Sequence, residues 1–182
     1  MENCACKVVF EFDNSADKLV SSLQYMLDNI AGGIPPHADP EDILFRCKAI
    51  ITELLTNAIK HAGQSSTRFD IESDGAKLTI CKTDTGMPMY LIDGRSNGPG
   101  TQIPADNKHL ISADPLSSLF AIWESENHIR FASEEGSLDD FLAVEQLAEH
   151  FGILIITNSS DEFTYTYDKS TRENIFRVRI NF

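Results

Sequence analysis

The stretch on which the fold prediction rests is residues 40–63, PEDILFRCKAIITELLTNAIKHAG. Asp39 is a favourable N-cap residue, Pro40 suits the first helical position, and Gly63 is a common helix terminator. Between these signals apolar residues recur at three- and four-residue spacing, which predicts the buried face of an amphipathic helix. The residues of this face are Ile43, Cys47, Ile50, Ile51, Leu54, Leu55, Ala58 and Ala62.

A polar row borders this apolar face. Glu53, Asn57 and His61 follow one another at intervals of four residues, so they lie along one edge of the predicted helix. A carboxylate one turn from a carboxamide can hold a water molecule with the first group and a hard cation such as Mg²⁺ with the second. The same spacing is typical of the solvated flank of an ordinary surface helix, so spacing alone leaves both interpretations open.

The string ELLTNAIKHA, from Glu53 to Ala62, resembles the N-box of the GHKL or histidine kinase-like ATPases, which have the Bergerat ATP-binding fold. Its Thr-Asn-Ala-x-x-His-Ala core is most similar to the anti-sigma factor serine kinases. The resemblance implies that Glu53 positions or deprotonates an attacking hydroxyl and that Asn57 holds Mg²⁺ between the phosphates of ATP. His61 is then either a further residue of the nucleotide site or a packed residue at the helix end.

A second motif, TDTGMPM, covers residues 83–89. A carboxylate at a strand end accepts from an exocyclic amino group, and a glycine two residues later lets the backbone approach a flat ring. By itself Asp84-x-Gly86 is more typical of a plain turn. One hairpin after an N-box, it resembles the first glycine box of the GHKL family, and Pro88 is typical of the anti-sigma kinase branch. The resemblance implies that Asp84 recognises adenine and that Gly86 admits its ring.

Periodicity fails over residues 90–135, which are punctuated by glycine and proline. A long irregular segment inside a compact domain is usually functional. The resemblance implies that this segment is an extended ATP lid, and the apolar residues between Leu116 and Trp123 predict a helix within it.

Gly136 lies where the family places its second glycine box, so the resemblance implies that it contacts the phosphates. The next glycine of that box is absent, and Asp139 and Asp140 occupy the start of the following predicted helix, which ends at Gly152. These carboxylates repel a triphosphate unless Mg²⁺ intervenes. The phosphate end of the site therefore departs from the family pattern.

The remaining pattern predicts one α/β (α+β) domain over residues 1–182. We expect a two-layer sandwich: a mixed, mostly antiparallel sheet with its helices on one face and a solvated opposite face. A further helix is expected from Ala16 to Ile30, and a hairpin turns at Asp74-Gly75. The other expected strands are Lys7–Phe12, Ile153–Asn158, Glu162–Tyr167 and Ile175–Phe182.

Composition limits the possible partners. Fifteen basic and 28 acidic residues give a net charge of −13, which disfavours binding to nucleic acid or to an anionic membrane. The sequence has no apolar run of membrane-spanning length and no secretion signal, and its four cysteines form neither a disulfide framework nor a tetrahedral metal pattern. We therefore expect a cytoplasmic protein.

Two functions follow from the resemblance. The first is a serine-protein kinase that uses ATP and Mg²⁺ and acts on a partner, which the resemblance implies is a sigma factor or an anti-sigma factor antagonist. The second is a non-catalytic GHKL-type module that binds adenine and regulates such a partner with a degenerate phosphate site. Whether two copies of the chain pair as a homodimer is left open by the sequence.

Overall fold

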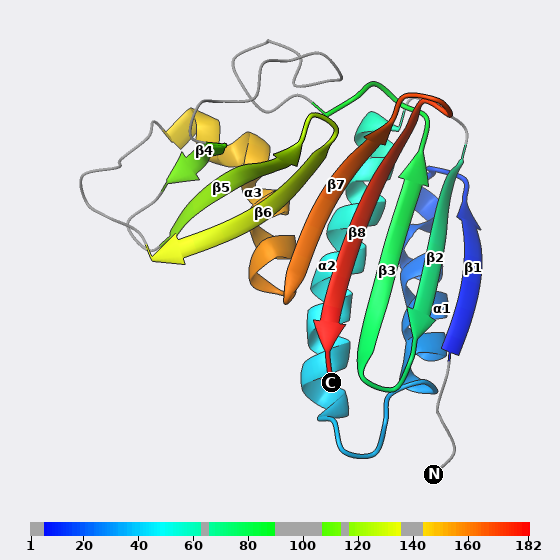
Figure 1. Cartoon of the computed structure of the whole chain (residues 1–182). Helices are drawn as coiled ribbons and strands as arrows, with labels where there is room; N and C mark the ends of the chain where they lie inside the picture. Colours follow the sequence, from blue (N-terminus) through cyan, green and yellow to red (C-terminus); the bar gives the residue numbers. More distant parts are fainter. Residues whose placement is uncertain (1–5, 63–65, 90–106, 114–116, 136–143) are drawn as a thin grey trace.

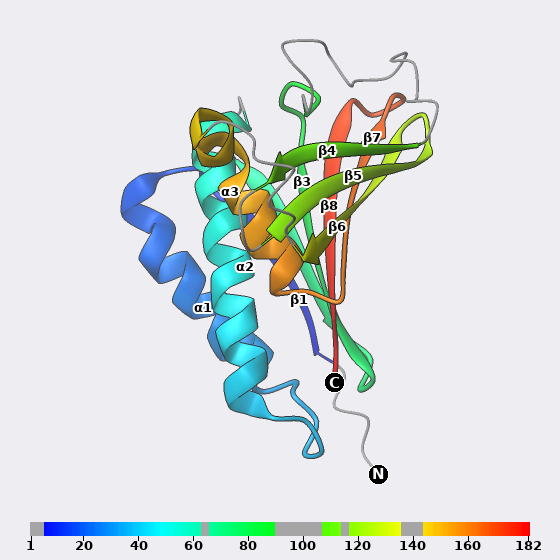
Figure 2. The same cartoon turned by 90° about the vertical axis from the view of Figure 1, so that its left-hand side faces the viewer.

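The chain is represented by a computed structural model that describes residues 6–62, 66–89, 107–113, 117–135 and 144–182. The described residues form one eight-stranded sheet in the order β1-β2-β3-β8-β7-β6-β5-β4, with three α-helices on one of its faces (Figures 1 and 2). In chain order the elements are β1 (Cys6–Phe12), the 3-10 helix η1 (Ala16–Lys18), α1 (Leu19–Ala31), α2 (Pro40–His61), β2 (Thr67–Ser73), β3 (Lys77–Asp84), β4 (Lys108–Ala113), β5 (Ser117–Ser125), β6 (His128–Glu135), α3 (Val144–Asn158), β7 (Glu162–Asp168) and β8 (Glu173–Asn181).

The sheet joins segments that are far apart in the sequence. β3 pairs with β2 on one side and with β8 on the other, so the last strand of the chain lies inside the sheet, beside β3. Every strand pair among the described residues is antiparallel, whereas the sequence predicted a mixed sheet. The α+β class and the placement of the helices on one face agree with the prediction.

Helix α2 confirms the expectation on which the fold prediction rests. It begins at Pro40, and the Asp39 carboxylate accepts from the backbone N–H groups of Glu41 and Asp42 at 3.0 and 3.3 Å. Every residue of the predicted apolar face is buried, and all of them except Ala62 belong to the hydrophobic core. Burying each large aliphatic side chain contributes about 1.5–3 kcal/mol, so this face is a major source of stability.

The prediction of a helix between Leu116 and Trp123 is wrong, because residues 117–125 form strand β5. Leu119, Ala121 and Trp123 alternate as buried residues along this strand. Phe120 and Ile122, between them, are also apolar, so the strand lacks the alternation of apolar and polar residues that identifies one. Of the predicted lid, residues 90–106 lie outside the described residues, whereas β4, β5 and β6 extend the sheet beyond β7.

Helix α3 also differs from the prediction. The helix does not end at Gly152, and residues 153–158 continue it as far as Asn158 instead of forming a strand. The isoleucines at 153, 155 and 156 favoured a strand, but packing of buried Leu154 and Ile156 against the core overrides that local preference. None of the described helices is long and apolar enough to cross a membrane.

We expect Asp39→Ala to lower the free energy of unfolding by about 1 kcal/mol, because two backbone N–H groups at the start of α2 lose their acceptor. Urea unfolding followed by circular dichroism measures this difference. Asp39→Ser is the control, since serine keeps an acceptor at the N-cap. Equal stability of the alanine and wild-type proteins would show that the cap does not stabilise the helix.

Candidate functional site

The predicted site residues form two groups along α2. Glu53 and Asn57 lie at the contact between α2 and α3, whereas His61 lies at the end of α2, beside the end of β3. Glu53 and His61 are two turns apart, about 12 Å along the helix axis. The site residues therefore follow one edge of α2 and do not converge on a single point.

Gly152 of α3 faces Glu53 and Asn57. A Cβ atom at Gly152 would lie 2.6 Å from Glu53 Oε2 and 3.8 Å from Asn57 Nδ2. Both side chains thus point toward α3, and both are half-buried. The absence of a side chain at position 152 leaves room for the Glu53 carboxylate between the two helices.

Asp84 forms a buried ion pair with Lys82 on the helix-facing side of β3. The Lys82 ammonium donates to Asp84 Oδ2, and each side chain is only 3% exposed. Lys82 Nζ also lies 4.6 Å from the centre of the Phe176 ring, a cation–π contact. Burial lowers the pKa of Lys82, and the charge and hydrogen bond of Asp84 oppose this effect. Removing one partner of such a pair would leave an uncompensated buried charge.

The second oxygen of Asp84 is also occupied. Asp84 Oδ1 accepts from the backbone N–H of Gly86 at 3.0 Å and from Asn174 Nδ2 at 2.9 Å. A Cβ atom at Gly86 would lie 2.7 Å from the carbonyl oxygen of Ala62 and 2.8 Å from that of His61. Glycine therefore lets the loop after β3 approach the end of α2, whereas the sequence predicted that Gly86 admits the ring of a base, which stays a prediction.

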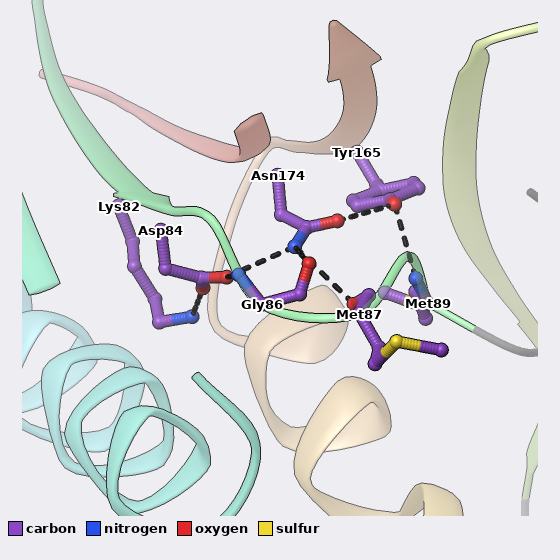
Figure 3. A network of polar contacts seen from close by, with 7 residues as sticks. All are labelled: Lys82, Asp84, Gly86, Met87, Met89, Tyr165 and Asn174. Atoms are coloured by element: carbon purple, nitrogen blue, oxygen red, sulfur yellow. Dashed lines mark hydrogen bonds and ion pairs between the residues drawn. The ribbon is translucent and has the colours of Figure 1, made fainter. Parts of the chain in front are cut away.

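Asn174, at the start of β8, was not identified from the sequence. Its Nδ2 donates to Asp84 Oδ1 and approaches the carbonyl oxygens of Gly86 and Met87 at 3.1 and 3.2 Å (Figure 3). Asn174 is 2% exposed. The sequence signal that could have identified Asn174 is its position in the alternation of β8. It lies on the same inward face as buried Val178 and Ile180, and a polar side chain on such a face needs a hydrogen-bonding partner.

Tyr165 of β7 completes this group, which we call the Asp84 network: Lys82, Asp84, Gly86, Met87, Met89, Tyr165 and Asn174 (Figure 3). The Tyr165 hydroxyl donates to Asn174 Oδ1 at 2.8 Å and accepts from the backbone N–H of Met89 at 3.0 Å. Burial raises the pKa of Tyr165 to about 12. The network therefore fastens the loop after β3 to both C-terminal strands.

His61 stands apart from these hydrogen bonds. Its side chain is exposed, and the partial burial of its ring is the largest cause of a lowered pKa, followed by the charges of Lys60 and Lys82. Asp84 acts on His61 in the opposite direction. The charges of Lys82 and Asp84 thus shift the pKa of His61, although His61 is not a hydrogen-bonding member of the Asp84 network.

Other expected features of a nucleotide site are not placed by the structure. Gly136 lies outside the described residues. Within the described parts of the chain, no group of three or more His, Cys, Asp or Glu side chains is arranged to hold a metal ion. A surface pocket of about 330 Å³ lies between β1 and α1, lined by Phe10, Lys18 and Tyr25 among others, and so away from the Asp84 network.

The fit of the expected ligands differs between the two groups. The carboxylate of Glu53 and the carboxamide of Asn57 are oxygen-bearing groups of the kind that Mg²⁺ prefers. Asp84 does not fit adenine in this arrangement, because the residue is only 4% exposed and the chain's own donors surround both of its oxygens. A base that used Asp84 would first have to displace one of those donors.

Gly86→Ala should destabilise the chain by about 1–3 kcal/mol, because the added methyl group meets two backbone carbonyl oxygens that cannot move aside cheaply. Gly32→Ala is a matched control, since a Cβ atom there would meet only the Asn29 carbonyl oxygen at an ordinary 3.7 Å. Chemical unfolding of both variants provides the comparison. Equal effects of the two substitutions would contradict the close approach of the loop to α2.

Tyr165→Phe tests the burial of the tyrosine hydroxyl through pH. The folded protein holds the Tyr165 proton up to about pH 12, whereas the unfolded chain releases it near pH 10.0. Stability from this group is complete below pH 10 and falls between pH 10 and 12, by up to about 1.4 kcal/mol per pH unit. We expect Tyr165→Phe to lose less stability over that interval than the wild type, measured by urea unfolding at several pH values. Tyr25→Phe, at an exposed tyrosine, should follow the wild-type slope.

The sequence matches no model of a known protein family and no curated protein. The resemblance to the GHKL ATPases rests on the two quoted strings, at residues 53–62 and 83–89.

Proposed function

We propose that this chain is an adenine-nucleotide-binding domain of the Bergerat type, similar to the anti-sigma factor serine kinases. Its activity is the transfer of the γ-phosphoryl group of ATP to a serine of a partner protein. The observation that carries the proposal is the placement of Glu53 and Asn57 beside Gly152, on the same helix whose end meets the Asp84–Gly86 loop. The Glu53 carboxylate and the Asn57 carboxamide thus lie on one edge of α2. The Asp84–Gly86 loop lies near the end of the same helix, about two turns beyond Glu53.

The residues have distinct roles in this proposal. Glu53 accepts the proton of the attacking serine hydroxyl, whose oxygen bonds to the γ-phosphorus as the bond to the ADP leaving group breaks. Asn57 contributes an oxygen ligand to Mg²⁺, which neutralises phosphate charge when bound. Asp84 and Gly86 form the base end of the site, and Gly136 lies at the phosphate end by resemblance alone.

The partner is proposed from the same resemblance: a sigma factor or an anti-sigma factor antagonist, met in the cytoplasm. The net charge of −13 favours a protein partner over nucleic acid. Pairing of two copies of this chain is compatible with the proposal and is not required by it.

A second function is favoured by one specific observation. After Gly136 the next glycine of the family's phosphate motif is absent and Asp139 and Asp140 follow, which favours a domain that keeps the fold and adenine binding as a binding module and no longer turns ATP over. Such a module would bind its partner without phosphoryl transfer. Its interaction with nucleotides would not depend on Mg²⁺, because the phosphate end would be degenerate.

Calorimetric titration distinguishes these functions. For the kinase we expect saturable binding of ATP that strengthens when Mg²⁺ is added. Asn57→Ala should weaken Mg-ATP binding by about tenfold or more, because a ligand of the cation is lost. Asn158→Ala, at an exposed asparagine of α3, should leave the affinity unchanged.

The results of the titration distinguish the kinase from the non-catalytic module. Binding of ADP and ATP with equal affinity, regardless of Mg²⁺, would favour the non-catalytic module. Absence of nucleotide binding by the wild-type chain, or equal losses in Asn57→Ala and Asn158→Ala, would contradict the kinase. Transfer of ³²P from ATP to a candidate partner, lost in Glu53→Gln with nucleotide binding retained, would support it directly.

A further inference from the structure

The Asn174 carboxamide occupies the acceptors that an incoming base would use. Its amide nitrogen lies within hydrogen-bonding distance of three oxygens: Asp84 Oδ1 and the carbonyl oxygens of Gly86 and Met87. Its own oxygen accepts from the Tyr165 hydroxyl. An asparagine side chain that is 2% exposed and bonded through both of its polar atoms is held in one orientation.

This carboxamide presents the same hydrogen-bonding pattern as the edge of adenine. A primary amide places an N–H₂ donor beside an oxygen acceptor, and adenine places its exocyclic N–H₂ donor beside a ring-nitrogen acceptor. Both edges are planar, so they suit the same combination of a carboxylate acceptor and a neighbouring donor. Asp84 and Tyr165 supply that combination to Asn174.

We propose that Asn174 is a built-in ligand of the Asp84 network, which a ligand with a planar amino and imine edge has to displace. The proposal rests on the proposed function where it names adenine as that ligand. Asn174 is thus a specificity-determining residue that competes with the base, and it differs in this respect from a residue that merely holds Asp84 in place for the base.

Release of Asn174 would also loosen the loop after β3. Two carbonyl oxygens of this loop, at Gly86 and Met87, accept from Asn174 Nδ2. The Met87 side chain in the same loop is 71% exposed, so the core does not hold it. The backbone N–H groups of Gly86 and Met89 keep their bonds to Asp84 and Tyr165, so entry of a base would loosen the loop through the Asn174 contacts in particular.

Asn174→Ala tests this inference by removing the built-in ligand. We expect adenine and ADP to bind this variant about tenfold or more tightly than the wild type, because no internal donor has to be displaced from Asp84. Asn181→Ala is the matched control, with the same substitution at an exposed position of the same strand. Affinities equal to or weaker than those of the wild type would overturn the inference, since Asn174 would then position the site instead of competing for it.

Acetamide provides a test that does not depend on nucleotide binding. A free primary amide in millimolar excess should raise the thermal midpoint of Asn174→Ala and leave those of the wild type and Asn181→Ala unchanged. If acetamide stabilises Asn174→Ala while adenine binds to none of the proteins, the built-in ligand is supported and the proposed function fails. The opposite result is also possible: the wild type binds Mg-ATP, but Asn174→Ala neither binds adenine more tightly than the wild type nor gains thermal stability from acetamide. The proposed function then stands and this inference fails.

Asn174→Ser keeps the inference testable should Asn174→Ala not fold. Serine leaves a polar group in the buried site but lacks the paired amide donor and oxygen acceptor of asparagine. Adenine and ADP should bind this variant more tightly than the wild type, with a smaller gain than in Asn174→Ala. Unchanged or weakened binding in a folded Asn174→Ser protein would count against competition by Asn174.

Discussion

The buried carboxylate of Asp84 is the constraint on which the centre of this structure depends. A charged group taken from water is tolerated only when its oxygens are paired, and the chain pairs them with Lys82, the Gly86 N–H and Asn174. These partners come from β3, the loop that follows it, and β8. One carboxylate thus connects β3 to the C-terminal strand β8 inside the sheet, beside the end of α2.

The two halves of the candidate site obey different physical requirements. At the α2–α3 contact, Gly152 leaves space for the half-buried carboxylate of Glu53, and Asn57 lies beside it. At the Asp84 network the polar groups satisfy one another and exclude a ligand until one of them moves. Under the proposed function, a nucleotide would therefore find the Asp84 network closed and would have to displace one of its members.

Local signals in the sequence were sufficient to predict α2 and the hairpin formed by β2 and β3. A capped start, a clear 3.6-residue periodicity and a terminating glycine agree on α2, and such agreement is what makes a segment predictable. The predictions for β5 and for the second half of α3 were wrong for the same reason. Each is apolar on more than one side, so periodicity cannot separate helix from strand, and only contacts with distant segments decide. Gly152 misled in particular, because a glycine required for close packing resembles a helix terminator.

The site could be predicted where its residues form a local string and could not where they come from distant strands. Asp84 and Gly86 are adjacent in the sequence, so their motif was visible. Asn174 and Tyr165 join them only through the pairing of β8 with β3 and with β7, which no local pattern encodes. The inward position of a polar side chain on each strand shows that a partner is needed, but it does not name the partner.

A crystal structure of the wild-type chain with ADP and Mg²⁺ tests the displacement of Asn174 most directly. We expect the adenine amino group to lie within hydrogen-bonding distance of Asp84 Oδ1, with the Asn174 carboxamide turned away from that oxygen and the Gly86–Met89 loop displaced. A structure in which the nucleotide binds elsewhere on the chain, with the hydrogen bond between Asn174 and Asp84 intact, would contradict it.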